Sequence, residues 1–384
     1  MKKVKLGEVG CVVTGNTPST KDIENYSSKD ICFIKPSDIY ENEITEIINS
    51  EFYISEYARC KARILPQNSV LVTCIGIIGK VGVNANEVAF NQQINAIIPN
   101  KEKCNYKYLA YAILSAKEKL NCVANAPVVP IINKTQFSDF EISLPSLEEQ
   151  KKIAERLDKV SSLIEKRKTQ LTKLDQLIKS RFIEMFGDPS TNEKGWVIRD
   201  LENVTTVVTY GLTVRPEYIS EGIDLVSARE LHKGYIDYNA APKISENDFA
   251  KLSEKGKPQK NDILFSKTGS IGHCALVTKE KPFAITQNAA RIGLKAEDVN
   301  PLWLLYYLRM DYIQNWCKDH AKGNAVKDLQ LQDMKVIPLF DCPLELQNQF
   351  AAFVEQTDRA KLAIQKSIDK LETLKKSLMQ QYFG

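Results

Sequence analysis

Two stretches of the chain carry apolar residues at the spacing of one helix face, with polar residues between them. In the first stretch an apolar residue recurs about every seven positions from residue 157 to residue 185. The predicted contact positions are Leu157, Ile164, Leu171, Leu174 and Ile178 in this stretch, and Ile364, Ile368, Leu371, Leu374 and Leu378 in a second stretch near the end of the chain. This pattern predicts two long helices that pair through a coiled-coil seam. About 40 residues at about 1.5 Å each form a rod of about 60 Å.

The residues before each predicted helix show a different pattern, in which short apolar runs alternate with polar turns. Residues 1–145 and 188–342 both mix strand-like runs with short helical segments and glycine-containing turns. The second region retraces the first at an offset of about 195 to 197 residues, and both predicted helices end in Phe-Gly. This period is too long for a solenoid, whose repeats are about 20 to 50 residues. The chain is therefore predicted to be a duplication of one domain together with its helix.

The fold class that follows is α+β, with two globular domains joined by two long antiparallel coiled-coil helices. The predicted segments are a first globular domain at 1–145, a first helix at 146–187, a second globular domain at 188–342 and a second helix at 343–384. Apolar seams on two helices of one chain are satisfied most simply when the helices pack on each other. A pseudo two-fold axis between the copies makes the helices antiparallel and builds the domain spacing into the rods.

The composition narrows the classes of function. The net charge of +4 is small, so any nucleic-acid face must come from uneven placement of charge. No stretch approaches the roughly 18 apolar residues of a membrane span and no signal peptide is evident, so we expect a cytoplasmic protein without a membrane segment. Nine cysteines without metal-like spacing and three scattered histidines predict no metal site and no catalytic residues.

Two motifs suggest catalysis, but their context favours a structural role. The segment 76–80 is glycine-rich and ends in lysine, yet it lacks the spacing of a phosphate-binding loop, and neither Ser nor Thr follows the lysine. Its glycines predict a tight turn with positive φ. The Asn-Pro-Leu-Trp sequence at 300–303 is faintly like a loop of adenine methyltransferases, but no glycine-rich cofactor strand accompanies it. We predict a helix start there.

The ordered series of motifs, present twice, resembles that of the specificity subunits of type I restriction-modification enzymes. The resemblance covers nearly the whole chain. The segments that carry it are the Leu-Gly-Glu-Val opening at 6–9, the Thr-Gly turn at 14–15, the glycine hairpins at 74–80 and 267–272, the Asn-Gln-Gln at 91–93, and the proline-led start and Phe-Gly end of each helix.

This resemblance implies a division of labour. Each globular domain would be a target-recognition domain for one half of a split target in double-stranded DNA, and the helices would set the gap and dock two methyltransferase subunits. The chain itself would have no catalytic site and bind no cofactor. The methyltransferases would bind S-adenosylmethionine and methylate adenine, and restriction subunits that use ATP and Mg²⁺ would join to cleave unmodified DNA.

Candidate DNA contacts are polar side chains at turns and hairpin ends. Arg and Lys pair with guanine and Asn and Gln with adenine, whereas contacts to phosphates position a reader without specifying sequence. The predicted contacts are Asn16, Thr17, Lys35, Lys80, Gln92 and Gln93 in the first domain and Arg215, Arg229, Lys267, Thr268, Ser270, Gln287, Asn288 and Lys327 in the second. Gln92 and Gln287 occupy equivalent places, which favours a shared structural role. Lys80 corresponds to His273, so the domains would contact DNA differently there.

Two other functions remain open from the sequence. A self-contained DNA methyltransferase would bind S-adenosylmethionine and modify DNA alone. A coiled-coil interaction protein without DNA specificity would show salt-sensitive binding without preference among sequences. Because the predicted domains are near neutral, we also expect the methyltransferase to supply much of the contact with the DNA backbone.

Overall fold

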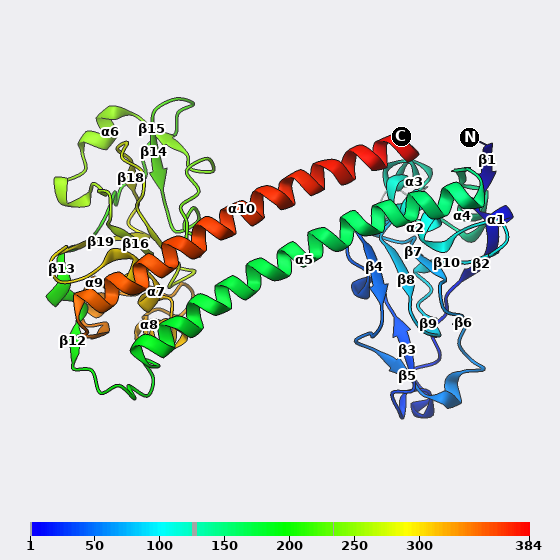
Figure 1. Cartoon of the computed structure of the whole chain (residues 1–384), viewed down its shortest axis with the longest axis horizontal. Helices are drawn as coiled ribbons and strands as arrows, with labels where there is room; N and C mark the ends of the chain where they lie inside the picture. Colours follow the sequence, from blue (N-terminus) through cyan, green and yellow to red (C-terminus); the bar gives the residue numbers. More distant parts are fainter. Residues whose placement is uncertain (1, 125–128, 233) are drawn as a thin grey trace. The chain divides into compact units, whose positions relative to one another are not determined.

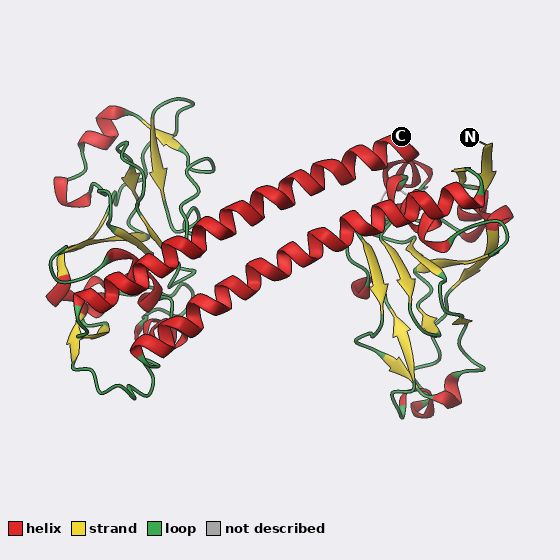
Figure 2. Ribbon diagram, viewed as in Figure 1, coloured by secondary structure: helices red, strands yellow, loops and turns green. Residues whose placement is uncertain are grey.

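The computed structural model describes residues 2–124, 129–232 and 234–384, and the chain divides into two compact units (Figure 1). Unit 1 comprises Met1–Thr169 and Gln365–Gly384, and unit 2 comprises Gln170–Ile364. The long helices α5 (Leu147–Phe186) and α10 (Leu344–Phe383) each contribute one part to each unit. Strands and short helices are mixed in both units (Figure 2). The predicted α+β class with an internal duplication and two long helices is confirmed.

Unit 1 contains eleven of the named strands and four short α-helices. Its strands are β1 (Lys2–Lys5), β2 (Gly10–Thr14), β3 (Ile31–Ile34), β4 (Ile44–Ile47), β5 (Tyr53–Ile54), β6 (Ile64–Leu65), β7 (Val70–Thr73), β8 (Val81–Asn84), β9 (Val88–Phe90), β10 (Ile94–Pro99) and β11 (Glu141–Leu144). Its short helices are α1 (Leu6–Val9), α2 (Tyr106–Ser115), α3 (Lys117–Val123) and α4 (Lys134–Asp139), with 3-10 turns η1 (Ile23–Tyr26), η2 (Pro36–Asp38) and η3 (Glu56–Ala58).

The core of unit 1 lies between a mixed sheet and the long helices. The sheet has the order β2-β10-β7-β8-β4, a second sheet has the order β5-β3-β9-β6, and β1 pairs with β11. Strand β7 is buried at every position, which matches its continuous apolar run. The end of α10 joins this core, where the ring of Phe383 lies 5.4 Å from that of Tyr108. Arg156 of α5 donates to the hydroxyl of Tyr382 at 3.0 Å.

Unit 2 repeats this plan with a smaller main sheet. Its strands are β12 (Ile198–Asp200), β13 (Thr205–Tyr210), β14 (Ile223–Val226), β15 (Lys243–Ile244), β16 (Ile263–Ser266), β17 (Cys274–Leu276), β18 (Ala284–Ile285), β19 (Ala289–Leu294) and β20 (Pro338–Phe340). Its helices are α6 (Glu246–Ala250), α7 (Pro301–Leu308), α8 (Asp311–His320) and α9 (Leu331–Lys335), with 3-10 turns η4 (Leu201–Val204) and η5 (Glu254–Gly256). The main sheet has the order β13-β19-β16-β17, a second has the order β15-β14-β18, and β12 pairs with β20 as β1 does with β11.

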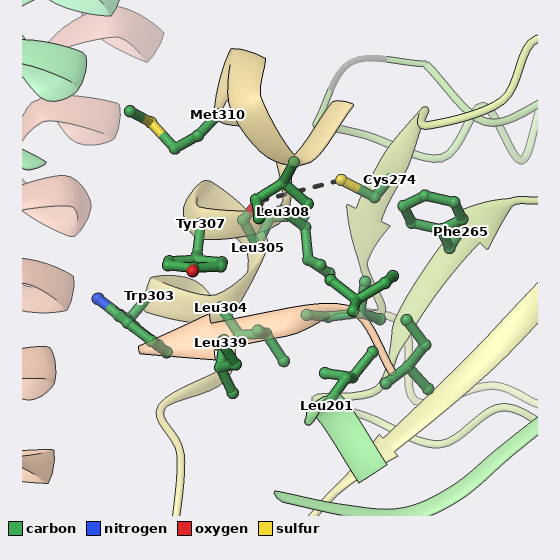
Figure 3. Packing of buried hydrophobic residues seen from close by; sticks show 14 of the residues in the cluster. Leu201, Phe265, Cys274, Trp303, Leu304, Leu305, Tyr307, Leu308, Met310 and Leu339 are labelled. Atoms are coloured by element: carbon green, nitrogen blue, oxygen red, sulfur yellow. Dashed lines mark hydrogen bonds between the residues drawn. The ribbon is translucent and has the colours of Figure 1, made fainter. Parts of the chain in front are cut away.

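Aromatic side chains dominate the core of unit 2. Trp303 and Tyr307 of helix α7 pack in this core beside Leu304 and Leu305 (Figure 3). The thiol of Cys274 points to the backbone oxygen of Leu305. The end of α5 completes the core, where Phe182 and Phe186 pack on Trp303 and on Phe350 of α10. Unit 2 is therefore closed by both long helices, as unit 1 is.

The long helices begin and pair as the sequence indicates. Ser146 and Glu149 form a reciprocal capping box, in which Glu149 N donates to Ser146 Oγ at 3.3 Å and Ser146 N donates to Glu149 Oε2 at 3.2 Å. In unit 2, Lys361 forms an ion pair with Asp175 at 2.7 Å. In both units, positions early in one helix contact positions late in the other, so each helix pair is antiparallel. None of the helices among the described residues is long and apolar enough to cross a membrane.

The predicted seam needs one correction. Its buried members are Leu157, Ile164, Ile178 and Ile368, and its half-buried members are Leu171, Leu174, Ile364, Leu371 and Leu378. Leu374, which we predicted as a contact, is exposed. Contacts at 364, 368, 371 and 378 follow spacings of four and three residues, and these spacings place residue 375 in the seam. Lys375 is accordingly half-buried, and burial lowers the pKa of its ammonium group.

Candidate nucleic-acid interface

The glycine hairpins between β7 and β8 and between β16 and β17 have the same hydrogen-bonded framework. The hydroxyl of Thr73 donates to Ile77 O at 2.6 Å, and the hydroxyl of Ser266 donates to Ser270 O at 2.5 Å. Four glycines adopt positive φ values of 76°, 82°, 79° and 99° at Gly76, Gly79, Gly269 and Gly272. The predicted tight turn is thus confirmed in both copies.

Each hairpin is held against a turn, which precedes β10 in unit 1 and β19 in unit 2. Cys74 N donates to Gln93 O at 2.9 Å, and Lys267 N donates to Asn288 O at 3.1 Å. These bonds place Gln92 and Gln287 at equivalent positions, as we predicted from the sequence. The side chains of both residues are exposed.

Two further segments join this loop cluster in each unit. Gly76 N donates to Pro130 O and Gly269 N to Lys327 O, both at 3.0 Å, so a segment before α4 and one before α9 lie beside the hairpins. The turn after β2 joins through Asn16 N, which donates to Phe90 O at 3.0 Å. The turn after β13 joins in the same way. Four loops from distant parts of the chain therefore meet in each copy.

In unit 1 the predicted contact residues of these loops are partly engaged with one another. The Thr17 hydroxyl donates to Gln92 Oε1 at 2.5 Å, so these two exposed side chains form one polar pair. Asn16 has a structural role, because its amide donates to Lys61 O at 2.7 Å and accepts from Arg63 N at 2.8 Å. The side chain of Gln93 is half-buried.

Lys80 and His273 correspond in the two copies. Each binds a backbone oxygen, in the segment after β3 for Lys80 and in the segment after β14 for His273. Lys80 Nζ donates to Pro36 O at 3.3 Å. His273 Nδ1 lies 3.0 Å from Leu231 O, and because a carbonyl oxygen only accepts, this nitrogen carries the proton. Lys35 lies in the same segment of unit 1, with its ammonium group 3.0 Å from the centre of the Phe52 ring. Lysine in one copy and histidine in the other therefore make the same structural contact, a hydrogen bond to a backbone carbonyl oxygen.

In unit 2 an ion pair organises the hairpin. Lys267 is buried, and its ammonium group lies 2.5 Å from Asp328 Oδ1, which also accepts from the Thr268 hydroxyl at 2.5 Å. A phosphate contact by Lys267 would have to compete with this carboxylate. Sequence reasoning missed Asp328, because it lies 61 residues from its partner.

The remaining predicted contacts of unit 2 are exposed to solvent. Arg215 lies in the loop after β13, with its guanidinium group 5.2 Å from the centre of the Tyr218 ring in the same loop. Arg229 belongs to the segment that His273 binds. The exposed residues of this set are Arg215, Arg229, Ser270, Gln287, Asn288 and Lys327.

Two buried glutamines that we did not predict as functional fix each long helix to the globular part of its unit. Gln150 Oε1 accepts from Asn105 N at 2.8 Å, and Gln347 Oε1 accepts from Asn300 N at 2.9 Å. Their amides donate to backbone oxygens near the start of the same helix. The signal was available in the sequence, because both copies carry glutamine in the first turns of the helix.

The features that suggested catalysis have structural roles. Asn300 caps α7 by accepting from Leu302 N at 2.9 Å and Trp303 N at 3.2 Å, which confirms the predicted helix start. Asn105 caps α2 in the same manner. Burial raises the pKa of the Cys274 thiol to about 12, so this group is protonated and a poor nucleophile at neutral pH.

The exposure of Lys327 predicts a distinct salt response. If it binds a phosphate, Lys327→Ala should weaken DNA binding about equally for all sequences and reduce the slope of log affinity against log salt by about 1. Fluorescence anisotropy of the assembled complex with DNA at several salt concentrations measures this slope. Lys281→Ala, at an exposed lysine elsewhere in unit 2, is the control. An unchanged slope for the Lys327 variant would exclude a phosphate contact.

Comparisons with known proteins agree with this arrangement. The family model described as the type I restriction modification DNA specificity domain matches residues 1–175 and again residues 218–375. The chain is 27% identical to the type I restriction enzyme MjaIX specificity subunit of Methanocaldococcus jannaschii, with 99% of this chain and 91% of the relative covered. It is 24% identical to the EcoBI specificity subunit of Escherichia coli, with 76% and 68% covered. The S subunit from M. genitalium shares the fold with a TM-score of 0.60 at 14% identity, over 100% of this chain and 96% of that one.

Proposed function

The chain belongs to the family of type I restriction modification DNA specificity domains, and on this premise we propose that each of its two copies reads one half of a split DNA target. The observation that carries the proposal is the loop cluster built twice on one hydrogen-bonded framework. A repeated framework with different side chains suits two readers of different half-sites. Polar groups at the loop ends, among them Gln92 and Lys327, would provide contacts to base edges and phosphates.

The chemistry is assigned to partner subunits in this proposal. Two methyltransferase subunits dock on the long helices, bind S-adenosylmethionine and flip the target adenine out of the duplex for methylation. Restriction subunits that use ATP and Mg²⁺ cleave unmodified DNA. The chain selects the DNA sequence that is methylated or cleaved, and it contributes no catalytic residue. It works in the cytoplasm, where cellular DNA is accessible to it. Tight specific binding by the isolated chain at physiological salt would contradict a methyltransferase contribution to backbone contact.

A pair of equivalent leucines on the helices is expected to bind the two methyltransferase subunits. Leu177 and Leu374 are 48% and 46% exposed, and in both copies a lysine lies four positions before the leucine and a serine three positions after it. One kind of partner that binds twice must meet the same surface twice. Leu177→Arg should therefore yield complexes with one methyltransferase instead of two, and the double variant Leu177→Arg/Leu374→Arg should yield none. Native mass spectrometry of the complex gives this stoichiometry.

Leu163 provides the matched control for this experiment. It is 47% exposed on α5, but the equivalent position of α10 is Ala360, so the surface around it is not duplicated. Leu163→Arg should retain both methyltransferase subunits. The assignment is wrong if Leu163→Arg loses a partner while Leu177→Arg keeps two.

The experiment that tests the proposed function is a genome-wide map of methylated adenines in cells with and without this gene. We expect a split motif that disappears with the gene. The purified chain should not methylate DNA alone, which distinguishes the proposal from a self-contained methyltransferase. If the assembled complex shows no preference among DNA sequences, the chain is an interaction protein and the proposal fails.

A further inference from the structure

The two glycine hairpins share one backbone framework but carry different types of side chain at equivalent positions. At the tip of the hairpin in unit 1, Ile75 forms a bridge with Ile131, and at the tip in unit 2 Thr268 forms the same bridge with Asp328. Three equivalent pairs therefore exchange an apolar for a polar side chain, namely Ile75 with Thr268, Ile77 with Ser270 and Ile131 with Asp328. The shared framework shows that the fold does not require either set.

The first tip, consisting of Ile75, Ile77 and Ile131, presents apolar side chains to solvent. Ile77 is 53% exposed and Ile131 is 40% exposed, and the equivalent positions of unit 2 carry Ser270 and Asp328. Val129, beside Ile131, does not distinguish the units, because it corresponds to the exposed Val326. Branched apolar side chains clustered at a loop end usually mark a surface that another molecule covers. The first tip therefore indicates a contact that the second tip does not make.

The difference between the tips indicates which molecule covers the first one. A methyltransferase that binds twice would meet the same chemistry in both units, as we propose for Leu177 and Leu374. The occupant of the tip must instead differ between the units, and the two half-sites of a split DNA target differ. The first tip also adjoins the polar turn of Gln92, because Cys74 N donates to Gln93 O at 2.9 Å. DNA is thus favoured over a protein partner.

We propose that the first tip reads thymine through the 5-methyl group in the major groove, with Ile77 as the main contact and Ile131 beside it. This inference rests on the proposed function, since it assumes that unit 1 lies on a half-site. Among the groups on base edges in the major groove, the thymine methyl is the one that apolar side chains recognise. Unit 2 has a hydroxyl and a carboxylate at these positions and makes no such contact at its tip.

Replacing thymine by uracil in the DNA removes that methyl group and leaves the hydrogen-bonding edge intact. After the target is known, each thymine of each half-site is replaced in turn, and the affinity of the assembled complex is measured. For at least one thymine of the half-site read by unit 1, wild-type affinity should fall about fourfold, the value of one buried methyl group. Ile77→Ala should bind the thymine and uracil forms of that site equally.

Two variants serve as controls. Ile77→Val keeps a branched side chain and should retain most of the difference between thymine and uracil, and Ser270→Ala in unit 2 should retain all of it. Ile77 is exposed, so its truncation should leave the fold intact, which circular dichroism can verify.

Three outcomes would overturn the inference. Wild-type affinity could be equal for thymine and uracil at every position, Ile77→Ala could preserve the difference, or Ile77→Ala could release the methyltransferase without changing the ratio. The last result would assign the tip to a protein contact. In each case the complex still prefers its target sequence, so the proposed function stands. Loss of all sequence preference would instead refute the proposed function.

Discussion

A chain with seven residues inserted into each long helix should direct methylation to a target whose gap between half-sites is about three base pairs longer. Seven residues add about 10 Å to a helix, and one base pair occupies about 3.4 Å of duplex. The seam has a period near seven, so this insertion preserves the contacts and rotates the helix by only about 20°. The boundaries between the units, after Thr169 and after Ile364, are suitable positions. A map of methylated adenines reads out the new gap directly.

Insertions that break the seam are the control for this experiment. Seven residues added to α5 alone shift one helix relative to the other, so the complex should lose methylation at both gaps. With both insertions, each half-site should keep its sequence, because the recognition loops lie outside the helices. A changed base within either half-site would contradict the role of the helices as spacers.

The largest loss of stability is expected from Phe182→Ala. Phe182 is 1% exposed, and its ring lies 5.0 Å from that of Phe186 and 5.3 Å from that of Phe350. Truncation of a buried phenylalanine removes apolar contacts and leaves a cavity, which costs about 3–5 kcal/mol. The three tryptophans of the chain, Trp196, Trp303 and Trp316, all lie in unit 2, so tryptophan fluorescence during urea unfolding reports on that unit.

Phe383→Ala is the matched control in unit 1. Its ring is half-buried against Tyr108, so the free energy of unfolding of unit 1 should fall by less than that of unit 2 does in the first variant. The tryptophan transition should not move. If Phe383→Ala shifts this transition as much as Phe182→Ala does, the two units unfold as one cooperative block.

The sequence predicted best what depends on local pattern. Apolar periodicity and the Ser146–Glu149 capping box located the first long helix within one residue at each end, since a long regular helix leaves few alternatives. The paired glycines located the hairpins, because a tight turn with positive φ has few other solutions. Leu374 was assigned to the wrong helix face, since one residue of drift in the heptad moves a side chain about 100° around the axis. The true heptad register was missed because one of its contact positions, residue 375, is a charged lysine and not an apolar residue.

Contacts between distant segments could not be predicted from pattern. Arg291 of β19 forms a buried ion pair at 2.6 Å with Asp262, the residue just before β16, whereas the first copy carries Ala96 and Ser69 at these positions. Asp328 and Lys267 likewise form an ion pair between distant segments. Such pairs depend on which strands and loops become neighbours in the fold. A single sequence shows where the charged residues are in the chain but not which of them meet. The candidate site was therefore predicted as a set of loops, while the partners of individual side chains were not.

The division of α10 between the units has a consequence for biosynthesis. Tyr382 and Phe383 pack on the core of unit 1, yet the ribosome makes them only after the whole of unit 2. The core of the domain made first is therefore closed only after unit 2 has been synthesised, whereas domains usually fold in the order of synthesis. A chain interrupted before Gln365 would expose apolar surface on its first domain. Cellular proteases would then remove incomplete products before they could compete for partners.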